Sequence, residues 1–248
     1  MSEFRMNSAQ GKAILALVRD GDHAHPGEEE AIALVARRVD RSNLRRLLDV
    51  GCGRGGSAAW FQQRGWGEVS GVDVDAESIE YARQRFPEVR FLHSDVADLP
   101  KQGIRRFDLI YLLTAYYAFP DQLSALQSMR EVCRPGAQLL LFDYSRPDGT
   151  PPPELGPEIG RPLRLDTIGG NLAETGWRLD GIEDWSDRFT GWYASLLGRF
   201  AERRTTIIRD SGTDWYDYVV TWYSALHRAL AEGRLGGALL RATAVAAD

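Results

Sequence analysis

The sequence predicts an α/β protein built on a doubly wound, mostly parallel sheet. Short apolar runs alternate with helical stretches along most of the chain, which is the pattern of βαβ units. The first run, residues 47–50, passes directly into a turn packed with glycines, and Asp73 ends the next run about twenty positions later. Glycines let a ligand approach the backbone, and an acid at that distance can hold a ribose diol. Together they predict a nucleoside-containing ligand at the first strand-to-helix turn.

Composition limits the class of protein. The chain has 248 residues, which suits one α/β domain with an elaboration, and 44% of them are hydrophobic and 26% charged. The formal net charge is −5 and there is no run of five like charges, which argues against a nucleic-acid partner. Because no apolar stretch reaches membrane-span length and the first twenty residues lack a signal-peptide pattern, we expect a cytoplasmic protein away from membranes.

The cysteines predict neither a metal site nor a disulfide. There are two, Cys52 and Cys133, and they form no spaced ligand set with other metal-binding residues. Both lie in segments that read as buried, so we expect unpaired thiols in a reducing compartment. Cys52 stands inside the glycine turn, where a small side chain is needed.

Two helices are expected before the sheet begins. Residues 9–19 carry apolar side chains at helical spacing, and residues 20–27 interrupt them. A second helix is predicted to start at Pro26, whose fixed φ suits a first helical position. Glutamates 28–30 then occupy its first turn and Arg37 and Arg38 its last, which suits the helix dipole at both ends.

The alternating pattern begins at residue 46. Strands are expected at residues 47–50, 69–74, 89–92, 107–113 and 138–144. Helices are expected between them at residues 57–64, 76–86 and 121–133. Asp121 is the predicted cap of the third helix, and Pro135 with Gly136 is predicted to close it.

The last third of the chain continues the alternation of helices and strands, except for one long helical region. Residues 148–153 are rich in proline and form the clearest connector, followed by a helix near 166–175 and a strand near 178–185. Residues 186–235 read as helical and are crowded with aromatic residues. A β-like run at 237–245 ends the series.

Five motifs resemble those of the class I S-adenosylmethionine-dependent methyltransferases. They occur in order at residues 49–55 (Asp-Val-Gly-Cys-Gly-Arg-Gly), 71–74, 94–96, 107–111 and 134–137, so the resemblance covers about positions 45–145. It implies S-adenosylmethionine as cofactor and S-adenosylhomocysteine as product. The glycines would lie under the methionine part, Asp73 would hold the ribose, and Asp95 with Val96 would meet the adenine. The implied cofactor-binding residues are Gly51, Cys52, Gly53, Asp73, Val74, Asp95, Val96 and Leu112.

The same resemblance refines the expected fold. It implies a Rossmann-like, seven-stranded methyltransferase sheet with the last strand antiparallel, helices on both faces and a helical insert between strands six and seven. We therefore expect residues 1–45 to form a helical cap over the cofactor site and residues 46–248 to form the methyltransferase domain. Within that domain, residues 186–235 are the expected substrate lid.

Each motif also has an ordinary structural interpretation, and other functions use similar turns. Asp73 could be a turn residue, and Asp95 could cap the turn at 96–99. A nicotinamide-dependent oxidoreductase would use the same glycine turn, but the chain lacks a Tyr-x-x-x-Lys pair and has lysine only at positions 12 and 101. A non-catalytic module that binds the nucleoside and presents the insert to a protein partner is the other alternative.

Three regions are expected to surround the methyl acceptor: residues 114–119, the aromatic insert and residues 22–27. The candidate acceptor-binding residues are Tyr116, Tyr117, Phe119, Trp192 and Trp215. Aromatic residues at helical spacing also serve as core, and some of these are expected to do so. Displacement at a sulfonium requires alignment more than a catalytic group, so no catalytic residue is assigned with certainty. His25 and Tyr117 are the candidates for proton transfer, with helix capping and pocket closure as their alternatives.

Scattered segments suggest which acceptor is favoured. Residues 115–122, 141–144 and 232–238 resemble bacterial small-molecule N-methyltransferases of the sarcosine/dimethylglycine type. This resemblance favours nitrogen in a small molecule as the acceptor and leaves oxygen or carbon open. Monomer and homodimer both stay open.

Overall fold

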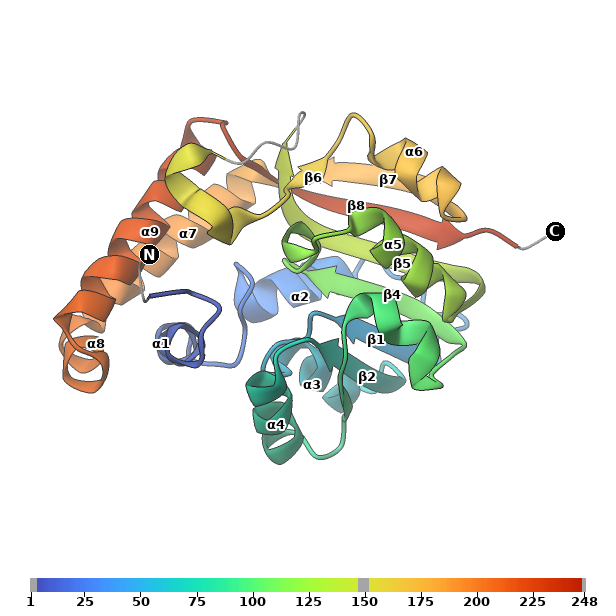
Figure 1. The fold of residues 1–248 in the computed structure, drawn as a ribbon, viewed down its shortest axis with the longest axis horizontal. Helices are drawn as coiled ribbons and strands as arrows, with labels where there is room; N and C mark the ends of the chain where they lie inside the picture. Colours follow the sequence, from blue (N-terminus) through green and yellow to red (C-terminus); the bar gives the residue numbers. More distant parts are fainter. Residues whose placement is uncertain (1–3, 147–151, 247–248) are drawn as a thin grey trace.

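In the computed structural model, which describes residues 4–146 and 152–246, an eight-stranded mixed sheet runs through the centre of the molecule (Figure 1). Seven strands follow the order β3-β2-β1-β4-β5-β8-β7, and the short β6 pairs with the end of β5. The strands are β1 (Arg46–Val50), β2 (Glu68–Asp73), β3 (Arg90–His93), β4 (Phe107–Leu113), β5 (Cys133–Arg146), β6 (Leu163–Arg164), β7 (Trp177–Asp184) and β8 (Gly236–Ala244).

Strand β8 is reversed relative to its neighbours. It pairs antiparallel with β5 on one side, where Leu240 faces Leu141, and with β7 on the other. The pairs formed among β1 to β5 are parallel, as is the pair of β5 with β6. The predicted α/β class and the reversed last strand are confirmed. The two-residue β6 is an addition that the sequence pattern did not predict.

Helices cover both faces of the sheet. They are α1 (Ala9–Arg19), α2 (Glu28–Ala36), α3 (Gly56–Gln63), α4 (Ala76–Arg85), α5 (Gln122–Glu131), α6 (Ile168–Glu174), α7 (Ser186–Glu202), α8 (Arg204–Ser211) and α9 (Thr213–Ala231), with 3₁₀ turns η1 (Val96–Gln102), η2 (Tyr116–Ala118) and η3 (Pro153–Ile159). One apolar cluster joins a face of the sheet to α1–α4, α7 and α9, and the other joins the opposite face to η1, α5 and α6. Alternate residues of each strand therefore belong to different layers.

Two predicted boundaries are wrong for identifiable reasons. The second helix begins at Glu28, because Gly27 adopts a φ of +79° and so breaks the helix after Pro26. The helix predicted to run to residue 133 ends at Glu131, and Pro135 and Gly136 lie within β5, beside an irregularity in its pairing with β4. The connector predicted at 148–153 falls largely on residues 147–151, outside the described residues.

Helices α7, α8 and α9 form the helical insert between β7 and β8 (Figure 1). Helix α7 packs on α9, and α1 packs against α7 and α8. Polar contacts tie the N-terminal region to this insert: Arg203 pairs with Asp20 at 3.0 Å, and Arg199 pairs with Glu28 at 2.9 Å. The predicted insert is confirmed, and the structure adds its attachment to the first two helices.

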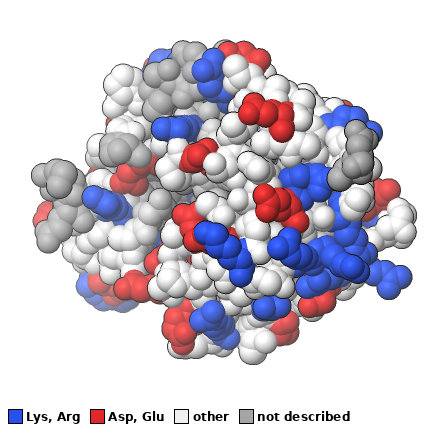
Figure 2. Space-filling model, turned by 45° about the vertical axis from the view of Figure 1, so that its right-hand side comes forward, with Lys and Arg blue, Asp and Glu red and all other residues white. Residues whose placement is uncertain are grey.

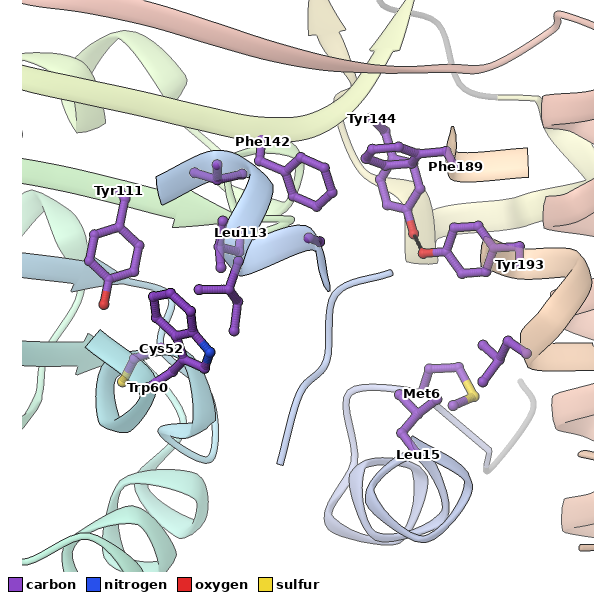
Figure 3. Packing of buried hydrophobic residues seen from close by; sticks show 14 of the residues in the cluster. Met6, Leu15, Cys52, Trp60, Tyr111, Leu113, Phe142, Tyr144, Phe189 and Tyr193 are labelled. Atoms are coloured by element: carbon purple, nitrogen blue, oxygen red, sulfur yellow. Dashed lines mark hydrogen bonds between the residues drawn. The ribbon is translucent and has the colours of Figure 1, made fainter. Parts of the chain in front are cut away.

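The insert shares its apolar core with the sheet. In Figure 3, Phe142 of β5 faces Phe189 of α7, and their ring centroids are 4.8 Å apart. Tyr111 of β4 and Trp60 of α3 extend the same cluster toward the glycine turn. Burying these large rings stabilises the fold by roughly 2 kcal/mol for each side chain. The insert is thus part of one core with the sheet rather than a separate domain.

The outer surface carries both signs of charge. On the face shown in Figure 2, acidic and basic side chains are interspersed, with the basic ones densest toward one side. Among the described residues, no helix combines the length and apolarity that a membrane crossing requires. The described residues also contain no group of three or more His, Cys, Asp or Glu side chains placed to hold a metal ion.

A buried carboxylate holds the segment that follows β4. Asp143 of β5 is fully buried, and its Oδ2 accepts hydrogen bonds from the backbone N–H groups of Tyr116 and Tyr117 at 2.7 and 3.2 Å. Its Oδ1 accepts a bond from the N–H of Tyr144 at 2.7 Å. Burial raises the pKa of Asp143 to about 7, although these bonds favour the ionised form. One side chain therefore sets the path of η2.

We predict that Asp143→Asn lowers the free energy of unfolding by about 1–3 kcal/mol at pH 8.5, above that pKa. An amide presents an N–H₂ group where the carboxylate presents an oxygen, so at least one buried backbone N–H loses its acceptor. Urea unfolding followed by circular dichroism measures the change. Asp40→Asn, at an exposed position, is the matched control. Equal unfolding midpoints for the two variants would contradict this role of Asp143.

Candidate functional site

The turn after β1 has one closed side and one open side. The N–H groups of Gly51 and Cys52 both donate to the carbonyl of Val72, at 2.8 and 3.0 Å, which fixes the turn to β2. Gly51 has a φ of +76°, and a Cβ there would overlap the methyl group of Ala115. Gly53 has a φ of +52°, and a Cβ there would meet nothing within 4 Å. The open side at Gly53 is where a ligand can approach the backbone.

Asp73 lies beside this turn, at the carboxyl end of β2. Its Oδ2 accepts a hydrogen bond from the N–H of Gly53 at 2.7 Å, and its Oδ1 accepts one from the N–H of Asp75 at 2.9 Å. The structure therefore brings together the glycines and the acid that the sequence singled out. It also shows Asp73 making a turn bond, which was the alternative interpretation.

The residues expected near the adenine lie closer to the protein surface. Asp95 is exposed, and its Oδ1 accepts from the N–H of Ala97 at 2.8 Å, so it caps η1. Val96 packs against the second apolar cluster, and Val74 is 67% exposed. In the structure Asp95 thus performs the capping role that had been the alternative to ligand binding.

Leu112 is a wrong assignment for a cofactor-contacting side chain. It is fully buried in the apolar cluster on the opposite face of the sheet. Its neighbour Leu113 lines the cavity at the glycine turn. Because side chains alternate between faces along a strand, a one-residue error in position moves the side chain to the wrong side.

A small cavity of about 40 Å³ lies between the glycine turn and the N-terminal region. The turn and the adjacent strands provide one wall, and α1 with the segment after it provides the other. The lining residues are Lys12, Leu15, Ala16, Asp22, His23, Ala24, His25, Asp49, Gly51, Cys52, Gly53, Arg54, Ser57 and Leu113. Lys12, Leu15 and Ala16 were not predicted, although their spacing places them on one face of α1.

Two ion pairs join the walls of the cavity. Lys12 of α1 pairs with Asp75, just after β2, at 2.5 Å. Asp22 pairs with Arg54 of the glycine turn at 3.0 Å, and the guanidinium carbon of Arg54 lies 3.7 Å from the ring centroid of Tyr81. The N-terminal region is therefore attached to both turns that surround the ligand-binding edge.

Asp49 is a functional candidate that the sequence interpretation did not single out. It is buried at the end of β1, lines the cavity, and its Oδ2 has no hydrogen-bond partner among the described residues. Burial raises the pKa of Asp49 well above its usual range, and the nearby charge of Asp73 raises it further. Tyr111 is its polar neighbour within the core, and Oδ2 still has the capacity to accept from an N–H group of a ligand. The sequence signal that could have identified Asp49 is its place as the first residue of the glycine motif.

His25 is buried, and both of its ring nitrogens are engaged. Nδ1 lies 3.2 Å from the carbonyl of Pro26, which can only accept, so Nδ1 carries the proton. Nε2 then accepts from the hydroxyl of Ser57 at 3.1 Å. Burial lowers the pKa of His25 well below its usual value, and the adjacent His23 lowers it further. The neutral ring therefore connects the N-terminal segment to α3.

The predicted acceptor residues after β4 divide between the two apolar clusters of the sheet. Tyr116 is buried, and its hydroxyl has no hydrogen-bond partner among the described residues. Its ring lies edge-on to Phe119, with centroids 5.9 Å apart, and the ring of Tyr117 lies 5.2 Å from that of Tyr144. Burial raises the pKa of Tyr117 above its usual value. Tyr116 and Phe119 therefore pack in the cluster that contains Leu112, whereas Tyr117 packs against the cluster that contains Leu113 and the insert.

The two tryptophans predicted to bind the acceptor belong to the insert, Trp192 to α7 and Trp215 to α9. Trp192 packs against Gly27, where a Cβ would collide with its ring, and its Nε1 donates to Glu30 at 3.0 Å. Trp215 packs edge-on against Phe4, with ring centroids 4.9 Å apart. Neither lines the cavity at the glycine turn. Both join the insert to the N-terminal region.

Comparison with known proteins identifies part of the chain. Residues 47–136 match a family model described as a methyltransferase domain. An O-methyltransferase of Aspergillus nomiae, rstn1, is 31% identical over 144 residues, which are 52% of this chain and 64% of that protein. Phosphoethanolamine N-methyltransferase 1 of Zea mays is 27% identical over 182 residues, which are 69% of this chain and 36% of that protein. The chain thus spans less than two thirds of the length of either relative.

Solved structures share the fold over nearly the whole chain. Phosphoethanolamine N-methyltransferase 2 of Haemonchus contortus superposes with a TM-score of 0.87 at 17% identity, over 97% of this chain and 58% of that one. A protein described as a sarcosine dimethylglycine methyltransferase of Galdieria sulphuraria gives a TM-score of 0.77 at 12% identity, over 88% and 85% of the two chains. Residues 47–136 thus match a methyltransferase domain, and the chain shares its fold with these two solved structures.

Proposed function

We propose that this chain transfers a methyl group from S-adenosylmethionine to a small-molecule acceptor, with nitrogen as the favoured nucleophile. The observation that supports it most is the open edge at Gly53, which lies beside the unpartnered oxygen of Asp49 and the carboxylate of Asp73. The cofactor supplies a sulfonium whose methyl group is open to direct displacement. The protein's part is to bind, orient and exclude water.

The residues at the turn fit such a cofactor. The unpartnered Oδ2 of Asp49 suits the ammonium of the methionine part, and Gly51, Cys52 and Gly53 offer backbone without a bulky side chain. Asp73 would exchange its bond to the Gly53 N–H for the ribose hydroxyls. In the same proposal, Val74, Asp95 and Val96 flank the adenine.

The size of the cavity requires movement. About 40 Å³ holds only a few water molecules, whereas ligand pockets commonly measure about 300–1,000 Å³. The wall that can move is the N-terminal one, because the opposite wall is the sheet. We therefore propose that residues 1–45 are a cap that opens for the cofactor. Residues 186–235, which contact this cap, are proposed as the lid over the acceptor.

The acceptor assignment rests on the residues beside the cofactor turn. Of the three candidates after β4, Tyr117 packs in the cluster shared with the insert, so its ring face can hold an amine, whereas Tyr116 and Phe119 pack in the opposite cluster. The relatives named above include both O- and N-methyltransferases, so an oxygen or carbon acceptor is the first alternative. A nicotinamide-dependent oxidoreductase would bind NADH, and a non-catalytic module would bind the cofactor without turnover.

Of the two candidates for proton transfer, Tyr117 is better placed than His25. His25 uses both ring nitrogens within the protein and has a lowered pKa, so it is suited to positioning. Tyr117 packs against Tyr144 in the cluster shared with the insert, and its backbone N–H is fixed by Asp143. We propose that Tyr117 contacts the acceptor nitrogen, and that an acceptor arriving as a free amine needs no base.

We predict that the protein binds S-adenosylhomocysteine and that Asp73→Ala weakens this binding at least tenfold. The loss reflects charge-assisted hydrogen bonds on the order of 1.5–3 kcal/mol. Isothermal titration measures both affinities, and Asp98→Ala on η1, which removes a side chain that pairs with Lys101 and is 47% exposed, is the control. No binding at millimolar ligand would refute the proposed function. An NADH titration under the same conditions separates the oxidoreductase alternative.

We predict that incubating the protein with metabolite extract and cofactor carrying a deuterated methyl group labels a small amine. Mass spectrometry identifies the labelled compound, and its fragmentation locates the methyl group on nitrogen, oxygen or carbon. A label on oxygen or carbon would contradict the nitrogen preference. Tyr117→Phe is expected to lower kcat for the identified acceptor while leaving S-adenosylhomocysteine affinity unchanged. Unaltered kcat and KM in this variant would remove Tyr117 from the acceptor site.

We predict that residues 4–27 exchange amide hydrogens faster without ligand than with S-adenosylhomocysteine. The cap must open to admit the cofactor, and ligand contacts then hold it closed. Lys12→Ala, which removes the ion pair to Asp75, should raise exchange of this segment in the free protein. Lys101→Ala removes an exposed ion pair to Asp98 and is the control. Equal protection of the segment with and without ligand would argue against a cap.

A further inference from the structure

Arg19 is a buried cation at the end of α1. Its side chain is 1% exposed, and its Nη1 donates to the carbonyl of His25 and to Oε1 of Glu28. Glu28 accepts from Arg199 of α7 through the same oxygen, at 2.9 Å. These contacts use Nη1 of the Arg19 guanidinium. The opposite edge, formed by Nε and Nη2, takes no part in them.

The other edge faces two tyrosine hydroxyls and no anion. Nε and Nη2 of Arg19 are buried and make no well-aligned hydrogen bond to any described residue. The hydroxyls of Tyr193 and Tyr223 interact with Arg19, which opposes the rise in their pKa that burial causes. Nε and Nη2 form the side-on fork of a guanidinium, which matches the two oxygens of a carboxylate or phosphate.

The charges around Arg19 do not balance. Glu28 is a single carboxylate shared by Arg19 and Arg199, so this cluster carries one positive charge in excess. A buried cation without a full set of partners is unfavourable, since burial removes its hydration. An anion placed at the free edge would supply both the missing charge and the missing acceptors.

The position of Arg19 relates it to the acceptor side of the site. Lys12, Leu15 and Ala16 line the cavity, and Arg19 follows one helical turn later on the same face of α1. Its partner His25 also lines the cavity. Beyond it lie tyrosines of β5 and the insert: Figure 3 shows Tyr144 and Tyr193 with their hydroxyls turned toward each other, joined by a hydrogen bond.

We infer that Arg19 is the anion-binding residue of the acceptor pocket, and that the acceptor carries a carboxylate or phosphate group. This inference rests on the proposed methyl transfer and adds the chemical class of the acceptor. The anion meets the Nε/Nη2 fork of Arg19, at the boundary between the cap and the insert. The cofactor's own carboxylate is the other possible source of such an anion, and the experiment separates the two.

The test uses the full-length protein saturated with S-adenosylhomocysteine and titrated with acetate and, separately, inorganic phosphate. We expect the wild type to bind at least one of these anions saturably at millimolar concentration, measured by isothermal titration. Arg19→Gln should weaken that binding at least tenfold. Arg19→Lys, which keeps the charge but lacks the fork, should fall between the two. Arg209→Gln, which removes an exposed arginine of α8 paired with Asp210, is the control and should stay within threefold of wild type.

The same titrations give the outcomes that overturn the inference. Absence of saturable anion binding by the wild type, or equal affinity in Arg19→Gln, removes Arg19 from an anion site. Should Arg19→Gln not fold, Arg19→Lys decides alone, and wild-type affinity in it overturns the fork geometry. A tenfold loss of S-adenosylhomocysteine affinity in the Arg19 variants assigns the anion to the cofactor instead. Failure of the wild type to bind S-adenosylhomocysteine at all would refute the proposed function itself.

Discussion

The turn between β1 and α3 admits no side chain at Gly51 or Gly56, and the rest of the site is arranged around this constraint. A Cβ at Gly51 would overlap Ala115 on the β4 side, and one at Gly56 would overlap the carbonyl of Asp22 on the N-terminal side. The turn is thus held between the sheet and the N-terminal segment. Only at Gly53 does the backbone face open space, which confines ligand approach to one edge.

The N-terminal region and the insert behave as connected walls because their contacts are shared. Glu28 binds arginines of both α1 and α7, and the ring of Trp192 occupies the space above Gly27. The same N-terminal region holds the turns after β1 and β2 through Asp22 and Lys12. A displacement that opens the edge at Gly53 therefore strains contacts of the insert, so binding of the proposed cofactor and acceptor is expected to be coupled.

The sequence alone predicted contacts between functional residues that lie close together along the chain. The glycines and Asp73 belong to successive strand ends of one βαβ unit, so their meeting follows from the topology. The prediction was wrong where a shift of one residue reverses the direction of a side chain: Leu112 and Leu113 point to opposite faces of the sheet. It also could not find Asp143 beneath η2 or Lys12 against Asp75, since such pairs depend on how distant elements pack. Likewise, Gly27 moved the start of α2 to Glu28, whereas Pro26 alone predicted an earlier start.

The charges of the site are arranged with opposite signs at its two ends. Asp49 and Asp73 place carboxyl groups at the cofactor turn, whereas Arg19 and Arg199 leave a positive excess toward the insert. In the proposed reaction, a sulfonium with its ammonium would suit the first end and an anionic acceptor the second, so that each ligand would be disfavoured in the other's place. Because methyl transfer would remove the sulfonium charge, the attraction at the carboxyl end would weaken and release of the spent cofactor would be favoured.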